Sequence, residues 1–376
     1  MKNKAKVLSI ILFLSVFIML FSCQKQKAAW KGTIEEEDGV TVVKNPKEPM
    51  YGEDVFSLEE ELIIGEEDKD NEPLFIDISS VRVDYEENIY VLDSKACQIK
   101  VFDKNGKYIR KIGRKGQGPG EMRLPTMMDI ISEKEIMICD LPNNRISFYS
   151  LQGELLKEVS KGTYFRLYNP IPDSNRNFIG SMRFRIEEKS VDELMKFDSN
   201  FRLLFTIDKL EYTDEPNVIY PFPPFIFFTV LEDDKVLWGN WLNYHLQIAN
   251  EEGRVTRKII KDYDPVIITD EEKERDIKER FGDAVVPPDS KLIYPKYYPA
   301  FYHLSTDDEG RIFVQTFERT EEGSHYYDIF DSEGKYIAKI PLKVRPRTWK
   351  KNKLYTIEED EEGFQMVKRY KVTWKH

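Results

Sequence analysis

The sequence predicts an all-β fold, a six-bladed β-propeller in which each blade holds four short strands. The first observation is a pattern of an apolar strand, a polar turn and a second apolar strand, as in residues 99–112 (IKVFDKNGKYIRKI). It returns in residues 146–159, 194–207, 246–259 and 327–340. Because β-branched and aromatic residues dominate these segments, they are typical of strands on a half-buried pleated surface.

The second observation is the spacing of the five copies. Equivalent positions are Phe102, Tyr149, Phe197, Ala249 and Phe330, so the intervals are 47, 48, 52 and 81 residues. A period of about 40–50 residues with four strands per unit is typical of a propeller blade. The last interval therefore indicates one period plus an insertion.

Two further strands precede each copy and complete the unit. The second strands are expected at residues 88–93, 135–140, 177–181, 235–240 and 311–315. First strands are expected at residues 76–84, 127–132, 227–233 and 303–307. Each unit thus reads as a small antiparallel sheet.

A sixth unit is split between the two ends of the chain. Residues 353–358 and 364–372 read as two of its strands, and the chain ends before a last strand. Residues 57–65 resemble the outer strand of the first unit, so we expect them to complete the sixth blade and remove an exposed sheet edge. Residues 40–43 are expected to add to the outer side of that same blade.

The N-terminus predicts export. Three lysines precede an apolar run at residues 7–21, which is typical of a signal peptide and short for a membrane span. The segment Leu20-Phe21-Ser22-Cys23 resembles a bacterial lipobox, which implies cleavage before Cys23 and lipid on its sulfur. An ordinary signal peptide with a chance cysteine is the alternative. We therefore expect a signal peptide at 1–22, a lipidated Cys23 and tether at 23–56, and the propeller at 57–376.

Net charge and cysteine content bear on nucleic-acid binding and on disulfide formation. The net charge of −11 becomes −14 after loss of the lysines at positions 2, 4 and 6. Such an acidic chain is not expected to bind nucleic acid, which needs basic side chains to displace counterions. Cys97 and Cys139 could form a disulfide in an oxidising compartment, or be two small apolar residues at strand ends, which we favour.

Residues 89–122 resemble an NHL-type repeat, and the whole chain is similar to six-bladed β-propeller lipoproteins of Bacteroidetes. The GxGPGE segment at 116–121 and the ending LYTIEEDEEGFQMVKRYKV at 354–372 carry this resemblance. It implies the propeller fold and a cell-envelope location, but no activity. Gln24 after the lipidated cysteine favours the outer membrane, facing the periplasm or the exterior.

The insertion, at about residues 261–302, contains the one clear helix. Thr269 or Asp270 can cap its start, and Gly282 is expected to end it. Several aromatic residues follow it. They either form part of a lid over the central pocket or pack the insertion onto the blades, and we favour packing for any single ring.

One face of the propeller is the candidate binding surface. Because neighbouring strands of a blade are antiparallel, the loops after second and fourth strands gather on the same side. The candidate ligand-binding residues on this face are Arg114, Lys115, Asn144, Arg145, Trp241, Asn243, Tyr244, His245, Tyr297 and Tyr298. The Gly-rich segment 113–120 among them lacks the Gly-Lys-Ser/Thr end of a P-loop and is expected to be a structural turn.

Catalytic signals are weak. The four histidines, His245, His303, His325 and His376, have no metal-ligand spacing, and no catalytic or metal-binding residue is predicted. The leading hypothesis is a lipid-anchored, non-catalytic module without a cofactor that binds a glycan, a peptide or an envelope protein. The alternative is a propeller hydrolase or lyase with a metal at its pore, calcium more readily than zinc, since carboxylates are plentiful.

Overall fold

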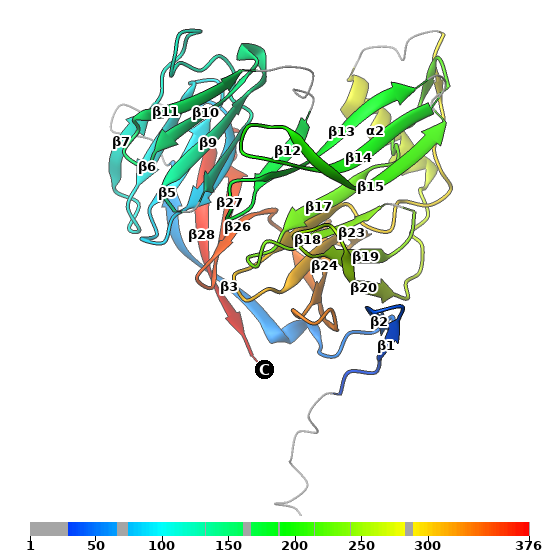
Figure 1. The fold of residues 1–376 in the computed structure, drawn as a ribbon. Coiled ribbons are helices and arrows are strands. Elements are labelled where there is room, and N and C mark those ends of the chain that lie inside the picture. Colours follow the sequence, from blue (N-terminus) through cyan, green and yellow to red (C-terminus); the bar gives the residue numbers. More distant parts are fainter. Residues whose placement is uncertain are drawn as a thin grey trace, which may run out of the picture. The chain divides into compact units, whose positions relative to one another are not determined.

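The computed structural model has six blades of four strands each, which confirms the predicted six-bladed propeller. Figure 1 shows the labelled strands of these blades. The structure describes residues 29–65, 74–131, 133–160, 167–186, 189–213, 215–240, 242–282 and 289–375. The predicted signal peptide and the predicted lipidation site, Cys23, lie outside these residues. No described helix has the length and apolar character needed to cross a membrane.

The first three blades follow one another along the chain. Blade 1 consists of β4 (Ile78–Val83), β5 (Ile89–Asp93), β6 (Gln98–Phe102) and β7 (Tyr108–Ile112). Blade 2 consists of β8 (Met127–Ile131), β9 (Glu135–Asp140), β10 (Arg145–Ser150) and β11 (Leu155–Ser160). Blade 3 consists of β12 (Leu167–Pro172), β13 (Phe178–Ile186), β14 (Lys189–Phe197) and β15 (Leu203–Thr213).

The other three blades complete the ring, and the last one borrows its outer strand. Blade 4 consists of β17 (Ile226–Val230), β18 (Val236–Asn240), β19 (His245–Ala249) and β20 (Val255–Lys261). Blade 5 consists of β22 (His303–Thr306), β23 (Ile312–Arg319), β24 (His325–Phe330) and β25 (Tyr336–Leu342). Blade 6 consists of β26 (Pro346–Lys350), β27 (Lys353–Glu359), β28 (Gln365–Trp374) and β3 (Phe56–Ile64).

Buried side chains lie between neighbouring blades, so the core is a ring of six interfaces. Each of six apolar clusters joins two adjacent blades, including blade 6 to blade 1. In that last interface Tyr355 and Val367 of blade 6 pack with Val81 and Val91 of blade 1. The alternating strand pattern explains this arrangement, because both faces of each blade bury side chains against a neighbour.

Ring closure by the N-terminal segment is confirmed. β3 pairs antiparallel with β28, with Ile64 opposite Val367 and Phe56 opposite Trp374. Ion pairs reinforce this edge: Arg369 Nε lies 3.1 Å from a Glu61 carboxylate oxygen. The first and last parts of the propeller therefore form one sheet, which leaves no unpaired edge on β28.

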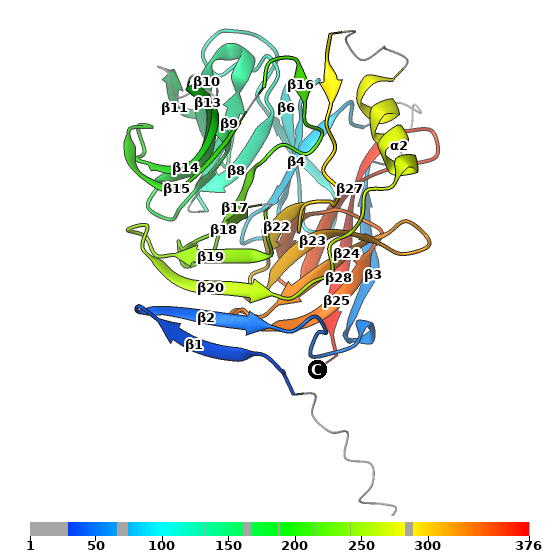
Figure 2. The same cartoon turned by 90° about the vertical axis from the view of Figure 1, so that its right-hand side faces the viewer.

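Residues 33–45 differ from the sequence prediction. They form a hairpin, β1 (Thr33–Glu37) and β2 (Val40–Asn45), rather than part of a tether. β2 pairs in parallel with β20, so it extends blade 4 and not blade 6 (Figure 2). The physical reason is burial, since Val42 and Val43 are 1% and 0% exposed at the outer edge of blade 4.

From blade 4 the chain continues along blade 5 to reach blade 6. Its backbone donates to the outer strand of blade 5, from Met50 N to Tyr336 O (3.1 Å) and from Tyr51 N to Ile337 O (2.9 Å). A short 3-10 helix, η1 (Glu53–Val55), then leads into β3. We call residues 33–64 the N-terminal arm; it covers the outer edges of three consecutive blades.

The insertion contains the predicted helix, α2 (Asp270–Phe281). Thr269 caps it in a capping box with Glu272, and Gly282 follows its last residue. Two short strands, β16 (Val218–Ile219) and β21 (Lys291–Leu292), pair in parallel. This pair joins the loop before blade 4 to the insertion after it.

Candidate functional site

The central channel is a large cavity lined by the innermost strand of every blade. Its volume is about 1010 Å³. The strands that contribute lining residues are β4, β8, β12, β17, β22 and β26. It is therefore the natural place to look for a bound ligand, since ligand sites are concave and few per protein.

The channel wall is basic although the chain is acidic. Among the described residues that line it there is no aspartate or glutamate. The same lining contains four arginines: Arg82, Arg202, Arg345 and Arg347. In a chain with a net charge of −11 this local excess of positive charge favours an anion.

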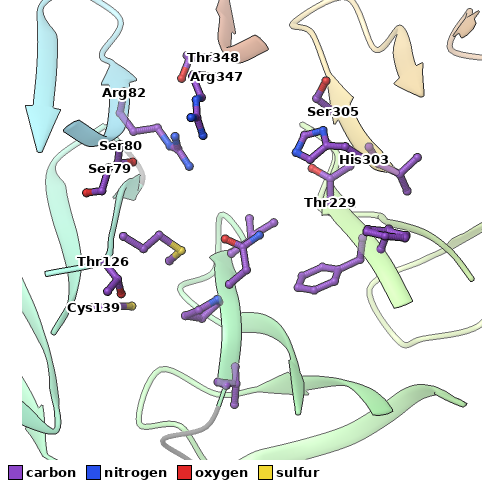
Figure 3. Close-up of a pocket in the computed structure, with 18 of the residues that line it drawn as sticks. Ser79, Ser80, Arg82, Thr126, Cys139, Thr229, His303, Ser305, Arg347 and Thr348 are labelled. Carbon is purple, nitrogen blue, oxygen red and sulfur yellow. The ribbon is translucent and has the colours of Figure 1, made fainter. Parts of the chain in front are cut away.

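Three of these arginines gather on one side of the channel. Arg82 lies on β4 of blade 1, and Arg345 and Arg347 lie at β26 of blade 6. Figure 3 shows the side chains of Arg82 and Arg347 directed into the cavity, with His303 of blade 5 on another wall. Blades 5, 6 and 1 thus form the basic half of the channel.

The arginines differ in their partners. Arg82 is neutralised by Asp129, whose carboxylate accepts from Nε at 3.1 Å and from Nη2 at 3.4 Å. No ion pair or hydrogen bond joins the guanidinium groups of Arg345 or Arg347 to another described residue. Arg345 lies over the ring of Tyr302, 5.8 Å from its centroid. In this basic half of the channel, two positive charges are therefore not balanced by a carboxylate of a described residue.

Shifted pKa values follow from this crowding. Desolvation, with the nearby charges of Arg345 and Arg82, lowers the pKa of Arg347. Burial lowers the pKa of His303 to about 4, and Arg345 and Arg347 push it in the same direction. His303 is therefore neutral at physiological pH, and it can donate or accept one hydrogen bond at each ring nitrogen according to its tautomer.

Two polar atoms on the channel residues have no partner among the described residues. Ser305 Oγ and Trp349 Nε1 are both buried and make no hydrogen bond to the described part of the chain. Such atoms are uncommon in folded proteins, because desolvation without a hydrogen bond is costly. Ser305 lies on the same strand as His303, at the basic half.

The opposite half of the channel is mostly apolar, and its one arginine, Arg202 of blade 3, is exposed. This half is formed by blades 2, 3 and 4, with Met127 of β8, Ile171 of β12 and Phe227 of β17 among its residues. Phe225 precedes β17 and stacks in a tilted arrangement on Phe227, with 5.1 Å between ring centroids. The channel is thus amphipathic across its width.

The donor groups of this wall do not fit a calcium ion, which prefers carboxylate and carbonyl oxygens. Arginine side chains, hydroxyl groups and one imidazole dominate the polar part of the lining. In the part of the chain that the structure describes, no three His, Cys, Asp or Glu side chains come close enough to hold a metal.

The predicted site residues of blades 1 and 2 support a loop rather than the channel. Arg145 is 7% exposed and donates to the backbone carbonyls of Gly118 (2.8 Å) and Glu121 (2.6 Å). Arg114 is exposed and pairs with the Glu121 carboxylate at 3.0 Å. Lys115 is also exposed, and its backbone forms a bridge with Met122.

Asn144 has a similar structural role. It adopts a left-handed conformation (φ 58°) at the end of the 3-10 helix η2 (Leu141–Asn143), and its N–H donates to Leu141 O. The Gly-rich segment 113–120 is therefore held by hydrogen bonds with nearby side chains, including those of Glu121, Asn143 and Arg145, as a structural turn requires. None of these four candidates lines the channel.

The predicted residues of blade 4 include one that is buried in the core. Tyr244 is 2% exposed, and its hydroxyl donates to Asp328 at 2.8 Å, so it cannot form part of an exposed binding surface. Asn243 is half-buried beside it, and Trp241 lies outside the described residues. His245 is largely exposed at the start of β19, and partial desolvation of its ring, with the charge of Lys258, lowers its pKa.

The tyrosines of the insertion behave differently from each other. Tyr298 stacks on Phe317 of blade 5, with ring centroids 4.5 Å apart and planes at 13°. Tyr297 is 38% exposed and lies beneath the Lys296 ammonium. No described residue of the insertion before Tyr302 lines the channel. These contacts favour packing of the insertion against the blades over a lid.

Arg345 and Arg347 were missed because the innermost strand beside them was not predicted from the sequence. β12 and β26 had no assigned position, and β26 brings Arg345 and Arg347 to the channel. A usable signal exists: Arg345 and Arg347 are two residues apart, so in an extended strand their side chains lie on the same face. Charged residues at such positions point to function, since packing does not need them.

Comparison with known proteins supports the fold. Residues 67–328 match a family model described as a domain of unknown function (DUF4934). A protein of Bacteroides fragilis NCTC 9343, described as exported, has 14% identity and a TM-score of 0.55, covering 89% of this chain and 100% of its own. A member of the DUF4221 family from Bacteroides vulgatus ATCC 8482 has 11% identity and a TM-score of 0.51, covering 86% and 100%. At these identities the likeness is one of fold.

Proposed function

The chain belongs to the DUF4934 family, and we propose that it is a non-catalytic binding module of the cell envelope whose ligand occupies the central channel. The observation that carries this proposal is the basic wall of the channel, where Arg345 and Arg347 have no carboxylate partner among the described residues. Charged side chains that do not stabilise the fold by pairing are expected where a ligand supplies the partner.

The size of the channel also supports binding. A volume of about 1010 Å³ suits a ligand of the size of an oligosaccharide or a short peptide, or one loop of a partner protein. The candidates from the sequence, a glycan, a peptide or an envelope protein, therefore remain the ligand classes to test. The proposed site, however, lies on the inner strands that line the channel and not on the loops predicted from the sequence.

The channel is tested by blocking it. In the full chain, Thr229→Trp places a large ring on an innermost strand, at a residue that lines the cavity. Thr206→Trp is the matched control, because Thr206 is exposed on an outer strand. Thermal unfolding of both variants verifies that they fold.

Binding is then measured on an array of defined neutral and acidic oligosaccharides and on a set of defined peptides. We expect at least one probe to bind the wild type and the Thr206→Trp variant, and to lose at least about 10-fold in affinity with Thr229→Trp. Equal binding to all three proteins, or no binding in any arm, contradicts the proposal.

We also propose attachment to the outer membrane through lipid on Cys23. The lipobox-like segment before Cys23 supports this, as does the exported relative from Bacteroides fragilis. The test is expression of wild type and Cys23→Ser in a Bacteroidetes host, with incorporation of labelled fatty acid and membrane fractionation as readouts. If both proteins are recovered equally in membranes and the wild type incorporates no labelled fatty acid, the proposed lipid anchor on Cys23 is contradicted.

A further inference from the structure

We propose that the channel takes an amphiphilic organic anion, a carboxylate or sulfate group carried on an apolar body, and that Arg345, Arg347 and Ser305 hold the acid group. The inference rests on the proposed function, since it names the chemistry of the ligand at that same site. It is carried by the division of the channel into a basic half and an apolar half.

The first step is charge. The guanidinium groups of Arg345 and Arg347 share one wall, and neither has an anionic partner among the described residues. Arg82 is close enough to add to the positive potential, but its guanidinium group is already paired with the Asp129 carboxylate. An arginine presents several N–H donors in a planar fork that fits a carboxylate or a sulfate group. The free pair therefore selects an oxyanion over a neutral group.

The second step is hydrogen bonding. Ser305 Oγ is buried at the same half and donates to no described residue, so a ligand oxygen could satisfy it. His303, two residues earlier on the same strand, is neutral at physiological pH and can add a further N–H. A site of two arginines, one hydroxyl and one imidazole provides enough donors for the oxygens of one acid group.

The third step is the facing wall. Met127, Ile171 and Phe227 line the side formed by blades 2, 3 and 4, and Phe225 extends the aromatic surface. A strongly hydrated ligand without an apolar part would leave this surface unused. Burying an apolar body there contributes about 25 cal/mol for each Å² removed from water. The two walls together favour an amphiphilic anion over a simple sugar acid.

The test uses three naphthalene probes that differ in their polar group and one anion that lacks the apolar body. 2-Naphthoate and 2-naphthyl sulfate carry the two oxyanions, 2-naphthylmethanol is the neutral counterpart, and glucuronate is an anion without the apolar body. Affinities for the full chain are measured by calorimetry. We expect both naphthalene anions to bind at least about 10-fold more tightly than the alcohol and than glucuronate, and their ratio tells carboxylate from sulfate recognition.

Variants identify the groups responsible. Arg345→Gln and Arg347→Gln are each expected to weaken the two anions by about 10- to 100-fold and to leave the alcohol unchanged. Arg347→Lys, which keeps the charge, is expected to retain part of the preference. Arg254→Gln is the matched control, because Arg254 is exposed in a turn of blade 4 outside the channel and loses the same charge.

The outcomes separate this inference from the proposed function. If the alcohol binds as well as the anions and Thr229→Trp abolishes both, the channel binds ligands but the anion inference is wrong. If Arg254→Gln weakens the anions as much as Arg347→Gln, general charge and not the channel is responsible. If the anions bind equally to Thr229→Trp, the channel is not the site and both proposals fail. If glucuronate binds as tightly as 2-naphthoate, the apolar wall does not contribute to binding and the inference of an amphiphilic ligand is wrong.

Discussion

The backbone N–H of Tyr336 donates a 2.7 Å hydrogen bond to Oδ1 of Asn45, across 291 residues of sequence. Asn45 also donates from Nδ2 to Gly334 O at 2.9 Å, so one buried side chain joins the N-terminal arm to the outer edge of blade 5. The arm is therefore an integral part of the propeller, held at blades 4, 5 and 6 in turn.

We predict that Asn45→Ala lowers the free energy of unfolding by about 1–3 kcal/mol, because buried backbone groups at Gly334 and Tyr336 lose their partner. Urea unfolding measures this, and hydrogen exchange should rise in residues 40–51. Asn105→Ala, at an exposed turn, is the control and should change stability little. Equal effects of both substitutions would show that the arm does not depend on Asn45.

Closure by β3 should be essential, whereas the hairpin β1–β2 should contribute less. Deleting residues 31–45 removes an added pair of strands and is expected to lower the melting temperature while the chain stays monomeric. Deleting residues 31–65 also removes β3 and exposes the edge of β28, so aggregation is expected. Size-exclusion chromatography and thermal unfolding distinguish the two. A monomeric, cooperatively unfolding protein without residues 31–65 would contradict this role of β3.

A buried ion pair at the interface of blades 4 and 5 supports a third prediction. Lys261 Nζ lies 3.3 Å from Asp328 Oδ2, and Asp328 also accepts from the hydroxyls of Tyr244 and Tyr336 at 2.8 and 2.6 Å. Burial, followed by the charge of Asp328, raises the pKa of both tyrosines, so both remain donors. Asp328→Asn leaves Lys261 buried without its counter-ion and is expected to cost about 3–5 kcal/mol.

Adding Lys261→Met to Asp328→Asn should recover part of that loss, because the unpaired charge is removed. Urea unfolding of the single and double variants measures the recovery. A double variant less stable than Asp328→Asn alone would mean that the lysine stabilises the interface through its contacts with the tyrosine rings, which it approaches to 5.0 and 4.7 Å.

His303 predicts a pH dependence of stability. Burial lowers its pKa to about 4 in the folded chain, against an ordinary value of about 6.5 when unfolded. Between these values the unfolded chain binds a proton that the folded chain does not, so this contribution to stability is complete above pH 6.5 and is lost as the pH falls towards 4.

His303→Gln should therefore reduce the loss of stability between pH 6.5 and pH 4 by about 1 kcal/mol, less than the full shift because solvent reaches the channel wall. Urea unfolding of both proteins over this range checks it. Near pH 7.5, where His303 is uncharged in the folded and the unfolded chain, the free energy of unfolding should change with pH in the same way for both proteins. If the difference in free energy of unfolding between the two proteins stays the same from pH 7.5 to pH 4, the lowered pKa of His303 is contradicted.

The two cysteines of the propeller are free and buried, which excludes the disulfide in this structure. Burial raises the pKa of Cys139 to about 12 and also raises that of Cys97. We predict that, in a Cys23→Ser chain, neither thiol reacts with Ellman's reagent until urea is added. A non-reduced mass lighter by two hydrogens would instead show a disulfide.

The blade repeat could be predicted because strands are local. Alternating apolar residues, turn residues and a regular period are visible in the sequence, and they located β3 as the missing strand of blade 6. The partner of β2 could not be predicted in this way. Its apolar Val42 and Val43 fit any free sheet edge, and only the path of the chain along blade 5 selects β20.

The candidate site shows the same limit. Loop residues such as Arg114 and Tyr244 looked functional because they interrupt the repeat, yet one pairs with Glu121 and the other is buried against Asp328. The channel residues looked ordinary, because a single arginine on a short strand carries no sign of its neighbours. Arg82 and Arg347 are far apart in sequence and share a wall only when the ring closes.

The sequence by itself therefore determined the all-β repeat, the six units, the split last blade and the helix of the insertion, since each depends on short-range pattern and turn chemistry. Only the tertiary structure decided where the hairpin β1–β2 pairs and which side chains face the channel. The physical reason is that both depend on contacts between blades, and such contacts are set by closure of the whole ring rather than by any one of its repeats.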